Sequence, residues 1–220
     1  MILSTAYFPP IEYFALIARD MKISPAEEDV MRSISPSIVY IEACENYQKQ
    51  SWRNRFRFDT PDGGQYFSIP IVHNRAVNEI PIREVQVDYS TPWIIREERA
   101  LISAYKNSAY FDYYKDELFA ILDSKPKLLF DLNLQIIDFF LRKTSIQAEI
   151  IPTKEYIKSY PDDYRDIIHP KKTNTILSDL GLEKPYFQVF ADKHGFIRSM
   201  SILDLLFNEG PDSILWLKKI

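Results

Sequence analysis

The hydrophobic pattern divides the first part of the chain into short segments with the periodicities of strands and helices. A hydrophobic run over residues 2–8 predicts a short buried strand, which two prolines end. Residues 11–19 then carry hydrophobic side chains at helical spacing, and residues 37–43 return to a strand pattern. This order predicts a right-handed parallel crossover, so we expect a β-α-β unit at the start of the fold. The polar, acidic residues 21–36 predict a loop within it.

Residues 52–58 have the alternation of a β-hairpin arm. The alternation places mainly aromatic side chains on one face and guanidinium groups on the other: Trp52, Asn54, Phe56 and Phe58 against Arg53, Arg55 and Arg57. The sequence Thr60-Pro61-Asp62-Gly63-Gly64 favours a turn, because it supplies a fixed φ and two residues that tolerate positive φ. The chain can therefore reverse into residues 65–70, and we predict a row of arginines on one face of a small antiparallel sheet.

Helices are predicted in the middle of the chain, over residues 92–106, 111–122 and 127–143, because each segment has hydrophobic residues along one side. Strand patterns also occur at residues 84–89, 148–151 and 186–190. Ser201-Ile202-Leu203-Asp204 matches a capping box and predicts a final helix that Gly210-Pro211 ends. The fold class that results is α/β, a mixed sheet with a parallel β-α-β start, an antiparallel hairpin and a helical middle packed on it. The alternative is α+β.

Composition narrows the class of protein. With 220 residues, 46% of them hydrophobic and 14% aromatic, the chain can bury a large core, and we expect residues 1–220 to form a single domain. A formal charge of −4 argues against general binding to nucleic acid or to an anionic membrane, since both need an excess of Lys and Arg. The single cysteine, Cys44, excludes an intrachain disulfide, and no hydrophobic run suits a membrane span. We therefore expect a cytoplasmic protein.

Several familiar kinds of site lack the residues that they need. Five scattered glycines cannot form a Walker loop or a dinucleotide fingerprint, and no motif identifies a cofactor. The histidines, His73, His169 and His194, are far apart in sequence, so no metal site is predicted. Cys44 lies between Glu42 and Glu45, and neighbouring carboxylates raise a thiol pKa, which favours an unreactive cysteine.

The arginine row is the main candidate for a binding site. Forked guanidinium donors at strand spacing suit a carboxylate or a phosphate, so we expect a small anionic or nucleotide-linked substrate. The candidate residues are Arg53 and Arg55, with Asn54 as an orienting amide and Lys49 nearby. The alternative is that the arginines only pair with acidic residues on a neighbouring strand.

Further candidates lie outside the hairpin. Ser4, Thr5 and Tyr7 follow the first strand, and open α/β sheets place ligands at the carboxyl ends of their strands, although strand-end polarity explains these residues equally well. Gln188 lies on a predicted strand. His169 precedes Pro170-Lys171-Lys172 in a predicted loop and is the candidate general acid or base, with an ordinary loop histidine as the alternative.

Over most of its length the chain resembles the WbqC-like protein family. The blocks that carry the resemblance are Tyr7-Phe8-Pro9, residues 47–55 with Ser51-Trp52-Arg53-Asn54-Arg55, Ser68-Ile69-Pro70-Ile71, residues 104–111 and residues 201–211. The resemblance implies a bacterial transferase of surface-polysaccharide (O-antigen) biosynthesis, with acyl or aminoacyl (glycyl) transfer to an amino sugar. The alternative is a noncatalytic protein that binds an anion or a partner. Leu3-Ser4-Thr5 and Ala43-Cys44 depart from the family's pattern, whereas Arg53-Asn54-Arg55 and His169-Pro170 keep its form.

Overall fold

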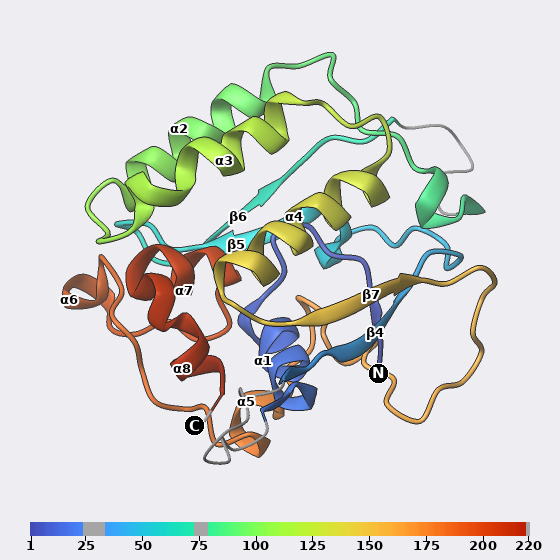
Figure 1. Ribbon diagram of the computed structural model, residues 1–220. Coiled ribbons are helices and arrows are strands. Elements are labelled where there is room, and N and C mark those ends of the chain that lie inside the picture. The colour runs from blue at the N-terminus through green and yellow to red at the C-terminus, as the bar shows by residue number, and fades with distance from the viewer. Residues whose placement is uncertain (24–33, 73–78, 219–220) are drawn as a thin grey trace.

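The computed structural model describes residues 1–23, 34–72 and 79–218 of the protein, and a three-stranded parallel sheet organises its first half. β4 (Ser37–Glu42) lies at the centre and pairs in parallel with β1 (Ile2–Ser4) on one side and β7 (Ala148–Pro152) on the other. α1 (Ile11–Asp20) lies between β1 and β4 in sequence and packs on the sheet (Figure 1). The predicted parallel β-α-β start is thereby confirmed.

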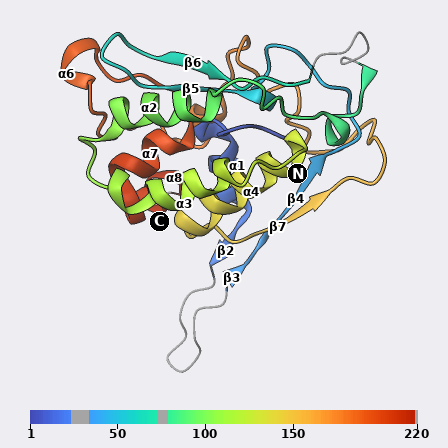
Figure 2. The same ribbon diagram turned by 90° about the horizontal axis from the view of Figure 1, so that it is seen from above.

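A short antiparallel pair follows α1. It consists of β2 (Lys22–Ile23) and β3 (Ile34–Ser35), and residues 24–33 of the predicted loop lie outside the described residues. Figure 2 shows this pair on the side of the molecule opposite the hairpin.

The predicted hairpin consists of β5 (Arg55–Phe58) and β6 (Gln65–Ser68), which pair with each other in an antiparallel ladder. Its turn closes with a hydrogen bond of 2.9 Å from the Gly63 amide to the Thr60 carbonyl, and Gly63 has a φ of +93°. A positive φ at this position explains the glycine, because a side chain would strain the turn.

The arginine row is shorter than the sequence predicts. Trp52–Asn54 forms a 3-10 helix, η1, capped by the Ser51 hydroxyl, which accepts a hydrogen bond from the Arg53 amide. Half-buried Arg55 and Arg57 alternate with buried Phe56 and Phe58, as predicted, but Arg53 precedes the strand and is only 3% exposed. The prediction that all three arginines share one strand face is therefore wrong for Arg53.

The predicted middle helices are present as α2 (Trp93–Tyr105), α3 (Phe111–Asp123) and α4 (Leu129–Lys143). The final predicted helix is α7 (Ile202–Glu209), where Ser201 caps the start by accepting a hydrogen bond from the Leu203 amide. The remaining helical elements are η3 (Ile82–Glu84), α5 (Ile176–Asp179), α6 (Ala191–His194), η4 (Gly210–Asp212) and α8 (Ser213–Leu217). The α/β prediction is confirmed, with parallel strands, an antiparallel hairpin and a helical middle.

Two predicted strands do not form ladders. With the part of the chain that the structure describes, residues 84–89 make only isolated bridges, from Val87 to Ile71 and from Gln86 to Leu128. Residues 186–190 form no described strand and lead into α6. Both strand predictions are wrong, because alternating burial needs an extended backbone but not a partner strand.

Aromatic packing joins the first strand to the hairpin and to α4. The Phe8 ring lies 4.6 Å from that of Tyr7, 4.8 Å from that of Phe56 and 6.0 Å from that of Phe140, measured between centroids, and all four side chains are fully buried. Phe8 has a φ of +43°, an uncommon value for a residue with a side chain. This packing fixes the path of the chain from β1 into α1.

Among the described helices, none has the length and apolarity needed to cross a membrane.

Candidate functional site

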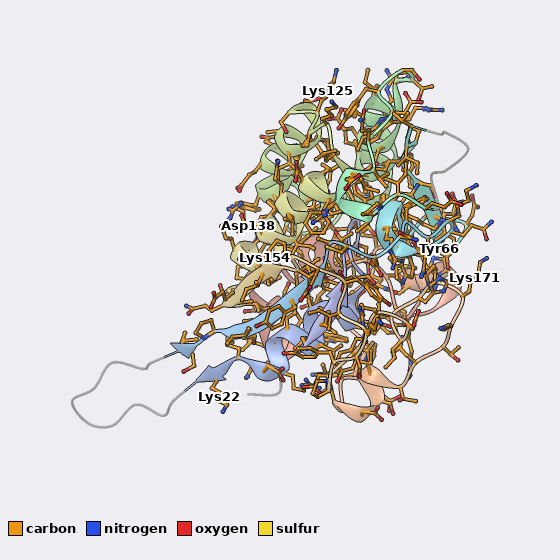
Figure 3. All side chains as sticks on the ribbon, turned by 90° about the vertical axis from the view of Figure 1, so that its right-hand side faces the viewer. Lys22, Tyr66, Lys125, Asp138, Lys154 and Lys171 are labelled. Carbon is orange, nitrogen blue, oxygen red and sulfur yellow. The ribbon has the colours of Figure 1, made fainter. Side chains whose placement is uncertain are left out.

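A cleft of about 440 Å³ lies between the hairpin, the start of α1 and the loop that contains His169. Basic side chains reach it from separate segments, with Arg57 on β5, His169 and Lys172 in the loop after β7, and Arg198 shortly before α7. Trp52 and Tyr66 also line it. We call it the cationic cleft, and the start of α1 contributes Glu12 to its wall. Figure 3 shows Tyr66 and Lys171, the neighbour of Lys172, on the same side of the molecule.

Arg57 keeps part of its guanidinium unused. Its Nη1 donates a hydrogen bond of 3.4 Å to the Arg198 carbonyl, whereas its Nε is buried with no hydrogen-bond partner among the described residues. A Cβ at Gly64 would lie 2.7 Å from this Nε, so glycine at that position leaves room for the arginine. A half-buried guanidinium with unused donors is suited to a phosphate or a carboxylate.

The aromatic side chains of the cleft form a stacked pair. The rings of Trp52 and Tyr66 lie 6.0 Å apart at an interplanar angle of 30°, and Tyr66 is 49% exposed. Arg55, on the same strand as Arg57, lies over the Tyr66 ring, and its Nε donates a hydrogen bond of 3.0 Å to the Ser68 hydroxyl. Arg55 therefore supports Tyr66, and Tyr66 provides an aromatic surface on which a base or a sugar can pack.

His169 lies in the cationic cleft with a defined tautomer. Its Nδ1 accepts a hydrogen bond of 3.2 Å from the Lys171 amide, so the proton of the neutral ring is on Nε2. Burial lowers the pKa of His169 below its usual 6.5, and the charges of Lys172, Arg53 and Lys171 lower it further. The ring is therefore neutral at pH 7 and is placed to donate a hydrogen bond from Nε2 rather than to accept a proton.

The donors of Arg53 are already used inside the protein. Nη2 of Arg53 lies 2.6 Å from Oε2 of Glu45, and Nε donates a hydrogen bond of 3.1 Å to Oε1. Nη2 also donates to the Ser4 hydroxyl at 3.0 Å, and Nη1 donates to Gln48. This forked pair joins the loop after β4 to the end of β1. Arg53 and Ser4 line a small cavity with Thr5, separated from the cationic cleft by Trp52 and Ile168, which line both.

Lys49 lines a different and larger cleft, of about 710 Å³, formed by the loops that follow β4 and β7. At its wall, buried Arg165 lies 3.0 Å from a carboxylate oxygen of Glu42 and also pairs with Asp163. The lining of this cleft therefore contains both acidic and basic residues. Because of this mixed charge, it should select anions less strongly than the cationic cleft does.

Two predicted ligands, Tyr7 and Asn54, make internal hydrogen bonds. The Tyr7 hydroxyl donates to Glu97 at 2.6 Å. Asn54 donates to the Ile69 carbonyl at 2.8 Å and accepts from the Tyr47 hydroxyl at 3.0 Å. Asn54 therefore positions the start of the hairpin.

Gln188 belongs to a buried cluster around Asp204. Its amide donates a hydrogen bond of 2.8 Å to the Asp204 carboxylate, which also accepts from the hydroxyls of Tyr105 and Tyr186 at 2.8 and 2.5 Å. Asp204 is thus engaged in the core and does not return to the Ser201 amide, which donates to the Arg57 carbonyl. Only the Ser201 half of the predicted capping box is present.

Sequence reasoning missed several residues of the cationic cleft. Arg57 belongs to the predicted arginine row, but only Arg53 and Arg55 were predicted as the clamp, and Tyr66 and Lys172 were assigned to no site. Arg198 and Glu12 carry no signal in the sequence, because only the fold brings them to His169. Among the described residues, no group of three or more His, Cys, Asp and Glu side chains could hold a metal ion.

Comparison with known proteins agrees with the resemblance seen in the sequence. The WbqC-like protein family matches residues 5–181 of the chain. The uncharacterized protein Rv1507c of Mycobacterium tuberculosis is 24% identical over 213 residues, which cover 84% of this chain and 88% of that protein. No solved structure gives a significant match.

Proposed function

The chain belongs to the WbqC-like protein family, and we propose that it is a cytoplasmic transferase of surface-polysaccharide (O-antigen) biosynthesis. We further propose that it transfers an acyl or aminoacyl (glycyl) group to an amino sugar, and that the cationic cleft binds a small anionic, nucleotide-linked substrate. The observation that carries the proposal is that Arg57, Lys172 and Arg198 meet His169 in one cleft, from three separate segments.

The charges of the cleft suit a diphosphate. Arg57 has an Nε without a partner among the described residues, and Lys172 and Arg198 line the same space. Guanidinium and ammonium groups bind phosphate oxygens through short, charge-assisted hydrogen bonds. Tyr66 and Trp52 add aromatic surface for the base or the sugar. The cleft volume, about 440 Å³, lies within the range of small-molecule sites.

His169 acts in this proposal as a hydrogen-bond donor to developing negative charge. When an amine attacks an acyl carbon, the electron pair of the C=O bond moves to the oxygen, and a fixed N–H donor stabilises that oxyanion. The neutral His169 ring, with its proton on Nε2, supplies such a donor in the cleft. The neutral ring can fill this role because Nδ1 is occupied by the Lys171 amide, which leaves the proton on Nε2 to be donated.

A turnover assay tests the proposal. Purified protein is incubated with acyl or aminoacyl ester and thioester donors and with nucleotide-linked amino sugars, and the amide product is measured by mass spectrometry. We expect product from the wild type, and none above background from His169→Ala, with nucleotide affinity unchanged within about twofold. Arg99→Gln, exposed on α2 and outside the cleft, is the matched control and should keep full turnover. Full turnover by His169→Ala would contradict the role of His169.

A noncatalytic binding protein is the second candidate, and one observation favours it. The Nδ1 lone pair of His169 is occupied by the Lys171 amide, so this ring cannot take a proton from a nucleophile without breaking that hydrogen bond. Tight nucleotide binding without turnover of any donor would support this candidate.

A further inference from the structure

Glu12 is a buried carboxylate in the wall of the cationic cleft. It lies in the first turn of α1, which begins directly after Pro9-Pro10, and is 3% exposed. Its Oε2 has no hydrogen-bond partner among the described residues. A buried polar atom without a partner costs free energy, so natural structures seldom keep one without a reason.

The Ser199 hydroxyl interacts with the Glu12 carboxylate as a hydrogen-bond donor, but Oε2 is left without a partner among the described residues. The charged groups that line the cleft with it are the cations Arg57, Lys172 and Arg198, and the neutral His169 ring lies among them. Arg57 acts on the carboxylate electrostatically, but Glu12 Oε2 and Arg57 Nε are both without a hydrogen-bond partner among the described residues. The terminal torsion of a glutamate is broad, so the carboxyl group can rotate to present an oxygen to a molecule in the cleft.

An anionic group of a ligand would be repelled by Glu12 and attracted by the cations around it. The ligand must therefore present a donor, an O–H or an N–H, to the carboxylate while its anionic group contacts Arg57 and Lys172. We infer that Glu12 binds the acceptor amine of the substrate and takes its proton, an inference that rests on the proposed function. Glu12 thereby acts as the base, a role that His169 does not fill.

The amine nitrogen attacks the acyl carbon of an ester or thioester donor, the C–N bond forms, and the C=O electron pair moves to the oxygen near His169. The nitrogen proton passes to the carboxylate of Glu12. When the C=O bond re-forms, the bond to the alcohol or thiol breaks, and that leaving group takes the proton from Glu12.

Binding measurements test the contact without turnover. Calorimetry compares UDP, dTDP and GDP with the same nucleotides carrying an amino sugar, for the wild type and for Glu12→Gln. We expect the wild type to bind the best amino-sugar nucleotide about tenfold more tightly than the bare nucleotide, as a hydrogen bond to a charged group allows. Glu12→Gln should lose that preference and keep its affinity for the bare nucleotide.

A stability measurement separates a binding role from a structural one. Burial raises the pKa of Glu12 above its usual value near 4.5, so wild-type stability falls as pH rises through the raised pKa. Glu12→Gln should therefore melt about 2–4 °C above the wild type at pH 8 and match it near pH 4. Glu149→Gln, exposed on β7, is the control and should match the wild type at both pH values.

The outcomes separate the two proposals. If the wild type prefers the amino-sugar nucleotide and Glu12→Gln keeps that preference, the inference about Glu12 is wrong and the proposed function stands. A lower melting temperature of Glu12→Gln at pH 8 would likewise assign Glu12 to the framework. If the wild type binds none of these nucleotides, the proposed function fails together with the inference.

Discussion

The hydroxyl of Tyr7 donates a hydrogen bond of 2.6 Å to Oε1 of Glu97, and both side chains are fully buried although 90 positions separate them. Burial raises the pKa of Glu97 from about 4.5 to about 8. This pair joins the segment between β1 and α1 to α2. The Glu97 carboxyl group, which is protonated at neutral pH, therefore holds the segment that leads to Glu12.

The first prediction concerns the pH dependence of stability. The folded pKa of Glu97 is raised, so its contribution is complete below pH 4.5 and is lost as pH rises to about 8. The wild type should therefore lose on the order of 3–5 kcal/mol of its free energy of unfolding over this pH range. Glu97→Gln cannot titrate at this position, so it should not show that loss. Denaturant unfolding of both proteins from pH 5 to pH 9 measures it. Identical slopes for the two proteins would contradict the assignment, and Glu84→Gln on the surface provides the control.

The second prediction concerns the Arg53–Glu45 pair. Arg53→Met leaves the buried Glu45 carboxylate without its cation and should destabilise the protein by about 3–5 kcal/mol. The double variant Arg53→Met/Glu45→Met should recover much of that loss, because no buried charge is then left unpaired. Additive effects in the double-mutant cycle would mean that the two side chains do not interact.

The third prediction assigns Gln188 to the framework. Gln188→Met removes one donor to the Asp204 carboxylate and the hydrogen bond to the Ile197 carbonyl, and should cost about 1–3 kcal/mol of stability. Its affinity for nucleotides should stay within about twofold of the wild type. A large loss of affinity with unchanged stability would return Gln188 to the binding site.

The fourth prediction concerns His169. Its pKa is lowered by burial and by neighbouring cations, so NMR should show it titrating below pH 6.5, while the pKa of His194 is raised by the Gly195 carbonyl and by Asp59. A phosphate group bound in the cleft should raise the His169 pKa by offsetting those cations. The spectrum of His169→Gln assigns the resonance. Titration of this ring above pH 7 in the free protein would be incompatible with the neutral donor.

Elements with strong periodicity could be predicted from the sequence. Hydrophobic stripes locate α1 to α4, and the Pro-Asp-Gly-Gly turn locates the hairpin, because these signals are local. Alternation at residues 186–190 correctly puts Tyr186 and Gln188 inside and Phe187 outside, yet these residues pair with no strand among those that the structure describes. A period of two reports which side of an extended chain is buried, and the ladder depends on a partner far away in sequence.

The candidate site could be predicted only in part, because it also depends on contacts between residues that are far apart in sequence. The alternating pattern predicts that Arg53 lies in a strand, whereas Ser51 favours the start of a helical turn. The helical turn forms, and Arg53 pairs with Glu45 instead of joining the strand face. Glu12 reads in sequence as an ordinary acidic residue of a first helical turn. Its importance comes from the fold, which places it beside Arg57.

The most direct test of the account is the affinity of the cationic cleft for a nucleotide diphosphate, measured by calorimetry in wild type, Arg57→Gln and Arg99→Gln. We expect the wild type and Arg99→Gln to bind alike, and Arg57→Gln to bind at least about tenfold more weakly, since it loses a charge-assisted contact. Two results would contradict the assignment of the substrate site to this cleft. One is equal affinity of all three proteins, and the other is a loss of affinity in Arg99→Gln while Arg57→Gln binds as tightly as the wild type.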